Sequence, residues 1–191
     1  MANTHVVVVI DRSGSMGAIR DDAQGAINQF LADQGSIVDE STISLWDFDT
    51  IIEKKMDARR IEKGLTYTLE PRGGTALYDA LGKAITGADE FLKSKDGAAD
   101  QPKNILLAVL TDGQENSSRE FSKTKITEMI KDRQERYGWQ IMYLSSDANA
   151  WADAKAIGIY SQNFTAYQST ADGYRAASAS ISASTTASRT A

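Results

Sequence analysis

The chain has 191 residues, 41% hydrophobic and 25% charged, which is enough for one globular domain with a full core. Its formal net charge of -5 argues against nucleic acid or an anionic membrane as the main partner. The sequence contains no cysteine, which excludes disulfides, thiolate zinc sites and cysteine nucleophiles. A cysteine-free chain is also compatible with the cytoplasm, which we take as the expected location.

The first predicted element is a strand over residues 5–10, an apolar run rich in valine. Such a run with no polar face is typical of a strand covered on both sides, as in the middle of a parallel sheet. Asp11, Ser13 and Ser15 follow it directly, and all three offer oxygen atoms. Ligands of open α/β sheets bind beyond the carboxyl ends of strands, and hard oxygen donors suit Mg²⁺. This loop is therefore a candidate cation site.

Apolar residues at helical spacing predict a helix over residues 17–34. Alternating polarity then predicts a strand over 41–49, followed by an antiparallel partner over 51–56 that carries lysines typical of a sheet edge. Asp47 and Asp49 lie near the end of the first of these strands. They could shape a secondary ion site, but we favour a solvated hairpin.

Residues 57–70 give no clear pattern beyond a short extended piece at 65–69. The Pro-Arg-Gly-Gly stretch 71–74 predicts a loop, and Thr75 is expected to open a helix. A second continuous apolar run over 104–110 ends in Thr-Asp-Gly, so that Asp112 repeats the opening pattern of a buried strand followed by an acid.

In the last third of the chain, Ser122 is predicted to cap a helix that ends at Gly138. Glu115 and Asn116, which precede it, could line a binding face or lie in a solvated loop. One face of this helix carries Ile126, Met129, Ile130 and Tyr137. A strand over 139–144, a short helix from Asp147 to Ile157 and a strand over 163–166 are predicted next. The chain then forms a closing helix with Tyr174, Ala177 and Ile181 on one face, and the Ser/Thr/Ala-rich stretch from Ser182 is expected to fray.

This alternation predicts an α/β fold: a doubly wound, mostly parallel central sheet with one antiparallel edge strand and helices on both faces. Three loops are then expected to meet at the carboxyl edge of the sheet. They carry Asp11, Ser13 and Ser15, then Thr75 after two glycines, and finally Asp112.

These motifs resemble the metal-ion-dependent adhesion site of the von Willebrand factor A domain, also called the integrin I-domain fold. That site uses an Asp-x-Ser-x-Ser loop, a distant Thr and a distant Asp. Asp11, Ser13 and Ser15 match the first part, Thr75 the second and Asp112 the third. We expect an A-type domain over residues 1–168, a helix packed on it over 169–182, and a flexible tail over 183–191.

The resemblance implies a Mg²⁺ site, with Mn²⁺ or Ca²⁺ as alternatives, in which the hydroxyls of Ser13, Ser15 and Thr75 touch the metal. The aspartates would act largely through water, so the cation stays electrophilic and favours an outside carboxylate. The implied function is therefore a metal-dependent protein-binding module that captures a Glu or Asp of a partner protein.

Other functions remain open at this point. The only histidine, His5, begins the first strand, at the wrong end for the site, and no Walker or dinucleotide-binding motif is present. We therefore expect no enzyme. One alternative is a structural or assembly subunit with incidental metal. The less favoured one is Mg²⁺-dependent phosphoryl transfer with Asp11 as nucleophile, since Ser13 stands where a second acid would be needed.

Overall fold

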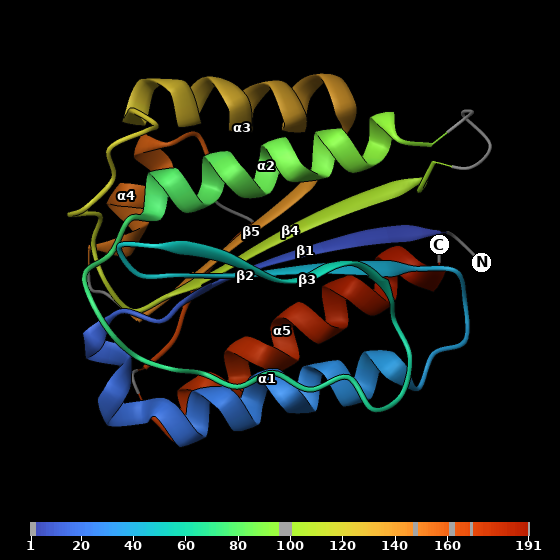
Figure 1. Ribbon diagram of the computed structural model, residues 1–191, viewed down its shortest axis with the longest axis horizontal. Helices are drawn as coiled ribbons and strands as arrows, with labels where there is room; N and C mark the ends of the chain where they lie inside the picture. Colours follow the sequence, from blue (N-terminus) through green and yellow to red (C-terminus); the bar gives the residue numbers. More distant parts are fainter. Residues whose placement is uncertain (1–2, 96–100, 147–148, 161–162, 169, 191) are drawn as a thin grey trace.

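The protein is described by a computed structural model that covers residues 3–95, 101–146, 149–160, 163–168 and 170–190. These residues form a six-stranded sheet in the order β3-β2-β1-β4-β5-β6 (Figure 1). β2 and β3 pair antiparallel, and every other neighbouring pair is parallel. The strands are β1 (Thr4–Asp11), β2 (Thr42–Phe48), β3 (Ile52–Arg60), β4 (Asn104–Thr111), β5 (Gln140–Ser145) and β6 (Phe164–Ala166).

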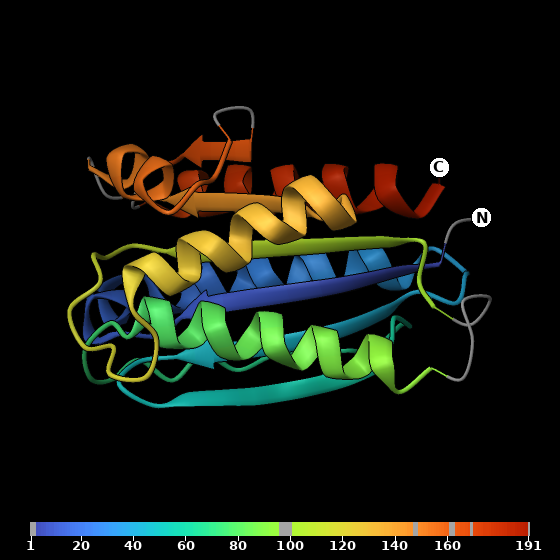
Figure 2. The same ribbon diagram turned by 90° about the horizontal axis from the view of Figure 1, so that it is seen from above.

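Helices cover both faces of this sheet, which confirms the predicted doubly wound α/β class. α1 and α5 lie on one face, and α2 and α3 lie on the other (Figures 1 and 2). None of them is both long and apolar enough to cross a membrane. The α-helices are α1 (Arg20–Gly35), α2 (Leu77–Lys93), α3 (Lys123–Tyr137), α4 (Ala150–Ala156) and α5 (Ala171–Thr190), and a 3-10 helix over Gly14–Ile19 joins β1 to α1.

Strand β1 is the centre of the core because its side chains alternate between the two faces. Val6, Val8 and Ile10 pack in the cluster that includes α1 and α5, whereas Val7 and Val9 pack in the cluster that includes α2 and α3. All five are at most 3% exposed. Each contributes on the order of 1.5–3 kcal/mol by burial, so the position at which β1 ends is firmly fixed.

Several predicted boundaries differ from the observed ones. The first helix begins with a 3-10 turn and becomes α-helical only at Arg20. β3 continues to Arg60, and residues 65–69 form no strand, although Leu65, Tyr67 and Leu69 are buried. The proposed cap Asp147 lies outside the described residues.

Helix α3 has the predicted caps. The Ser122 hydroxyl accepts the Lys125 backbone N–H at 3.2 Å, and Gly138 adopts the left-handed conformation. The placement of Tyr137 on its buried face is wrong, because that side chain is 63% exposed and lies beside the Arg133 guanidinium.

The C-terminal helix extends further than predicted. α5 runs to Thr190, so the fraying expected from Ser182 is wrong for the residues described up to that point. Its small side chains allow it to lie close to α1, where the Gln34 amide donates to the Ser182 carbonyl and to the Thr186 hydroxyl. Arg189 is fully buried and holds the end of the helix in place through Asp39.

Candidate metal centre

The loops that follow β1 and β4 meet through short contacts between oxygen-bearing side chains. The hydroxyls of Ser13 and Ser15 lie 3.1 Å apart, and the Ser15 hydroxyl donates to Oδ1 of Asp112 at 2.9 Å. β1 and β4 are adjacent parallel strands, so both loops leave the sheet at its carboxyl edge. The sheet thus brings together residues almost one hundred positions apart in the sequence.

Asp11 ends β1 and is fully buried beneath these hydroxyls. Its Oδ1 accepts the Ser13 backbone N–H at 2.7 Å, and its Oδ2 accepts the Thr111 hydroxyl at 2.7 Å. Burial is the main cause that raises the pKa of Asp11 to about 6, against the effect of these hydrogen bonds; the charge of Asp112 adds to the rise. A nearby cation would favour the ionised form and oppose that shift.

Thr75 completes the group from the third loop and is 4% exposed. A β-carbon placed on Gly113 would lie 3.4 Å from the Thr75 hydroxyl oxygen and 3.9 Å from Oδ2 of Asp11. The two side chains therefore face the same small space, which the absence of a side chain at Gly113 keeps open. A β-carbon on Gly74 would lie 2.5 Å from the Ser117 hydroxyl, so a side chain there would force Ser117 to move.

Asn116 holds Thr75 at the backbone. Its side-chain oxygen accepts the Thr75 N–H at 2.9 Å, and its own N–H donates to the Thr75 carbonyl at 2.9 Å. These bonds hold Thr75 in the loop, and α2 begins at Leu77, two residues later than predicted. Asn116 thus holds the backbone of Thr75 in place and is not simply part of a solvated loop.

Two acids tie the same loop to the start of α2. Glu115 accepts the backbone N–H groups of Tyr78, Ser117 and Ser118. Asp79, which the sequence did not single out, is 4% exposed and accepts the backbone N–H groups of residues 119–121. These bonds hold the loop after β4 against the loop that carries Thr75.

The donor set fits a hard divalent cation. Three hydroxyls and two carboxylates converge, and oxygen is the donor that Mg²⁺ and Ca²⁺ prefer. In the part of the chain that the structure describes, no three His, Cys, Asp or Glu side chains gather as a metal cluster. A cation held here would therefore depend on Ser13, Ser15 and Thr75 as much as on the acids.

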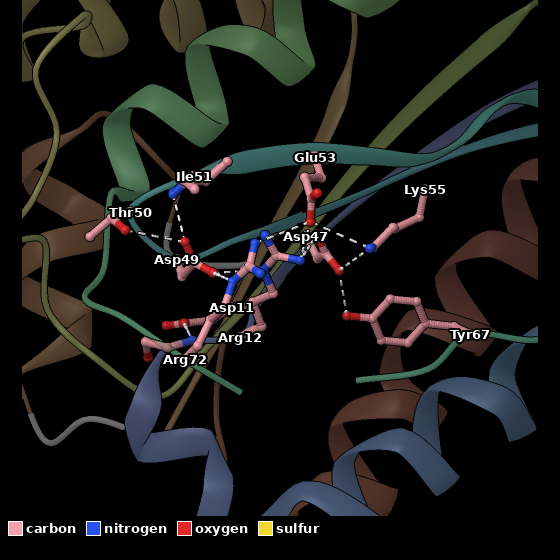
Figure 3. Close-up of polar contacts among 11 residues, drawn as sticks. Asp11, Arg12, Asp47, Asp49, Thr50, Ile51, Glu53, Lys55, Tyr67 and Arg72 are labelled. Atoms are coloured by element: carbon pink, nitrogen blue, oxygen red, sulfur yellow. Dashed lines mark hydrogen bonds and ion pairs between the residues drawn. The ribbon is translucent and has the colours of Figure 1, made fainter. Parts of the chain in front are cut away.

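No pattern in the sequence is strong enough to assign a role to Arg12, which lies between Asp11 and Ser13. Its side chain is fully buried and its Nε donates to Oδ2 of Asp49 at 2.9 Å (Figure 3). Asp47 and Asp49 are 0% and 1% exposed, so the interpretation as a solvated hairpin is wrong. An arginine directly after a buried strand, with one acid near the end of the neighbouring parallel strand and another just after it, is the pattern that could have indicated this cluster.

A hollow of about 710 Å³ opens beside the three loops. Thr50, Asn116 and Ser117 line it, and all three approach Gly74, the residue before Thr75. Charged residues of both signs also line it: Lys83 and Arg119, and the acids Asp79 and Glu120, the second of which accepts a hydrogen bond from Lys83 at 2.8 Å.

No protein-family model matches the sequence, and no curated protein matches it either. The fold is that of von Willebrand factor A domains, as solved structures show. The vWF domain of the type V pili tip protein Mfa5 from Porphyromonas gingivalis superposes with a TM-score of 0.67 at 12% identity, over 98% of this chain and 96% of that one. A von Willebrand factor type A structure from Catenulispora acidiphila gives 0.65 at 15% identity, over 95% and 42%.

A third similar structure is proximal thread matrix protein 1 from the mussel byssus, solved with zinc in its metal-ion-dependent adhesion site, the MIDAS motif. It has a TM-score of 0.62 at 15% identity and covers 95% of this chain. This chain spans only 45% of that mussel protein, and less than two thirds of several other structures that it resembles. At these identities the likeness concerns the fold.

Proposed function

We propose that this chain is a metal-dependent protein-binding module that captures an acidic residue of a partner through a bound Mg²⁺. Asp11, Ser13, Ser15, Thr75 and Asp112 would hold the ion, with Mn²⁺ or Ca²⁺ as alternatives. The observation that carries the proposal is the convergence of three loops on one oxygen-lined space, with the Ser15 hydroxyl 2.9 Å from Asp112 and Thr75 facing Asp11 across Gly113. A similar fold with zinc at its MIDAS motif supports a divalent ion in this position.

The three hydroxyls explain why a partner carboxylate would be attracted. If Asp11 and Asp112 act through water, the ligands in direct contact with the cation are neutral and the cation stays electrophilic; Asp11 already accepts two hydrogen bonds that hold its carboxylate in place. A Glu or Asp side chain from outside would then supply the missing negative charge.

No reaction is proposed for this site. Similar structures are named as matrix, pilus and adhesin proteins, which supports binding over catalysis. A cytoplasmic location stays a prediction that cell fractionation would test.

The test is a pull-down with the purified chain as bait in Mg²⁺, followed by elution with a chelator. We expect proteins that are retained in Mg²⁺, released by the chelator and not retained by Thr75→Ala bait. Thr185→Ala is the matched control: Thr185 is fully buried in α5, one turn before Ser188, which contacts Thr4 at the opposite edge of the sheet. Equal retention in Mg²⁺ and in chelator would reject the metal bridge and favour an assembly role with incidental metal.

A further inference from the structure

Asp49 connects two of the three loops that form the candidate metal centre. It follows β2, is 1% exposed, and uses one carboxylate oxygen, Oδ2, to accept two arginines (Figure 3). Arg12 Nε donates to it at 2.9 Å, and Arg72 Nε donates to it at 2.7 Å. Arg12 belongs to the loop of Ser13 and Ser15, whereas Arg72 belongs to the loop of Thr75.

The backbones of the same two loops are joined around this carboxylate. Arg72 N–H donates to the Arg12 carbonyl at 2.8 Å, and Gly14 N–H donates to the Gly73 carbonyl at 3.1 Å. The Asp49 carbonyl accepts the N–H of Ala76, the residue after Thr75, at 2.9 Å. Asp49 therefore contacts both of the loops that carry the candidate ligands Ser13, Ser15 and Thr75.

Gly73 allows this close approach. Its φ of +67° is the left-handed conformation that favours glycine, and a β-carbon there would lie 3.3 Å from the β-carbon of Asp49. The other oxygen of Asp49, Oδ1, accepts the Ile51 backbone N–H at 2.6 Å. The carboxylate is thus held on one side by its own turn and is presented on the other to both arginines.

We propose that Asp49 is a positioning residue for the metal centre, and that its bonds to Arg12 and Arg72 set the separation between the Ser13 and Ser15 hydroxyls and Thr75. The inference rests on the proposed function, since it concerns the same ion. Partners behind metal ligands typically change metal affinity 10–100-fold when they are removed, because they fix the orientation of the ligands. Asp49 acts on the ligands of two loops at once.

Arg72 separates positioning from simple electrostatics. Its side chain is half exposed, so Arg72→Gln leaves no cavity in the core. Loss of a positive charge near the site would, by Coulomb attraction alone, tighten the binding of a divalent cation. Loss of the contact to Asp49 would release the Thr75 loop and weaken the binding of the cation. The two explanations therefore predict opposite signs.

Asp47 provides the matched control for Asp49. It is fully buried in the same cluster, and its carboxylate lies 3.1 Å from Arg12 Nη1. Its other contacts are Lys55 and the Tyr67 hydroxyl, and among the described residues no hydrogen bond or ion pair joins it to the loop over 71–76. Asp47→Asn and Asp49→Asn remove the same charge from the same cluster, but only the second removes a bond to the Thr75 loop.

The experiment is calorimetric titration of Mg²⁺ and Mn²⁺ into the wild type and the three variants, with circular dichroism to establish that each is folded. We expect about tenfold weaker binding for Asp49→Asn, several-fold weaker binding for Arg72→Gln, and less than about threefold change for Asp47→Asn. Unchanged or tighter binding by Arg72→Gln, or equal losses in both aspartate variants, would overturn the inference. Arg72→Gln decides alone if Asp49→Asn does not fold. A wild type that binds neither ion would instead overturn the proposed function.

Discussion

The hydroxyl of Ser15 donates to Oδ1 of Asp112 at 2.9 Å, across 97 positions of sequence. This contact joins the loop after β1 to the loop after β4. The contact exists because the two strands are adjacent and parallel, so that their carboxyl ends meet at one edge of the sheet.

Replacement of Ser15 by alanine should separate metal binding from stability. Ser15 is exposed, so Ser15→Ala is expected to change the free energy of unfolding by less than about 0.5 kcal/mol. If its hydroxyl is a ligand, the affinity for Mg²⁺ should fall at least about tenfold. Ser94→Ala, at an exposed serine after α2, is the control and should change neither quantity. Denaturant unfolding and calorimetry measure the two effects, and an unchanged Mg²⁺ affinity would remove Ser15 from the ligand set.

The single histidine predicts a defined loss of stability in acid. Burial is the main cause that lowers the pKa of His5 from 6.5 to about 4 in the folded chain. Its Nδ1 is hydrogen-bonded to the Thr42 hydroxyl at 2.8 Å, and its ring packs at a tilt of 31° against Phe91. The unfolded chain binds a proton more readily than the folded one between these two values. The contribution of His5 is therefore fully present above pH 6.5 and is lost as the pH falls toward 4, by about 3 kcal/mol.

Two measurements test this prediction. Because His5 is the only histidine, its imidazole signals in a proton NMR titration need no further assignment, and they should report a pKa near 4. The non-titrating variant His5→Gln should lose less stability than the wild type between pH 6.5 and 4. A histidine that titrates near 6.5 would contradict its burial.

Arg189 should make the C-terminal helix part of the stable fold. Its guanidinium is fully buried and contacts both carboxylate oxygens of Asp39, at 2.9 and 2.8 Å. Arg189→Ala leaves that carboxylate without its charge partner and should cost about 3–5 kcal/mol. Arg175→Ala removes an exposed ion pair from the same helix and should cost less than about 1 kcal/mol. Equal costs in urea unfolding would mean that Arg189 does not hold the helix.

The sequence predicted the sheet class and the loop positions because hydrophobic patterning is local. The valines of β1, the apolar run of β4 and the caps of α3 each carry their signal within a few residues. The end of α5 carries no such signal, because its stability comes from Arg189 and from small side chains that fit against α1. Long-range contacts of that kind cannot be read from composition.

The same distinction between local and long-range signals holds for the candidate site. The motif residues were evident, but their support was not: Arg12, Asp49 and Asp79 act through partners that only the tertiary fold brings near. Asp49 looks like an ordinary turn residue in the sequence. Its role depends on which strand lies next to β1, and therefore on strand order.

The most direct test of the account is calorimetric titration of Mg²⁺ into the metal-free wild type, Thr75→Ala and Thr185→Ala. We expect one saturable site in the wild type, an equal site in Thr185→Ala, and at least about tenfold weaker binding in Thr75→Ala. No saturable binding in the wild type, or the same affinity in Thr75→Ala, would contradict it.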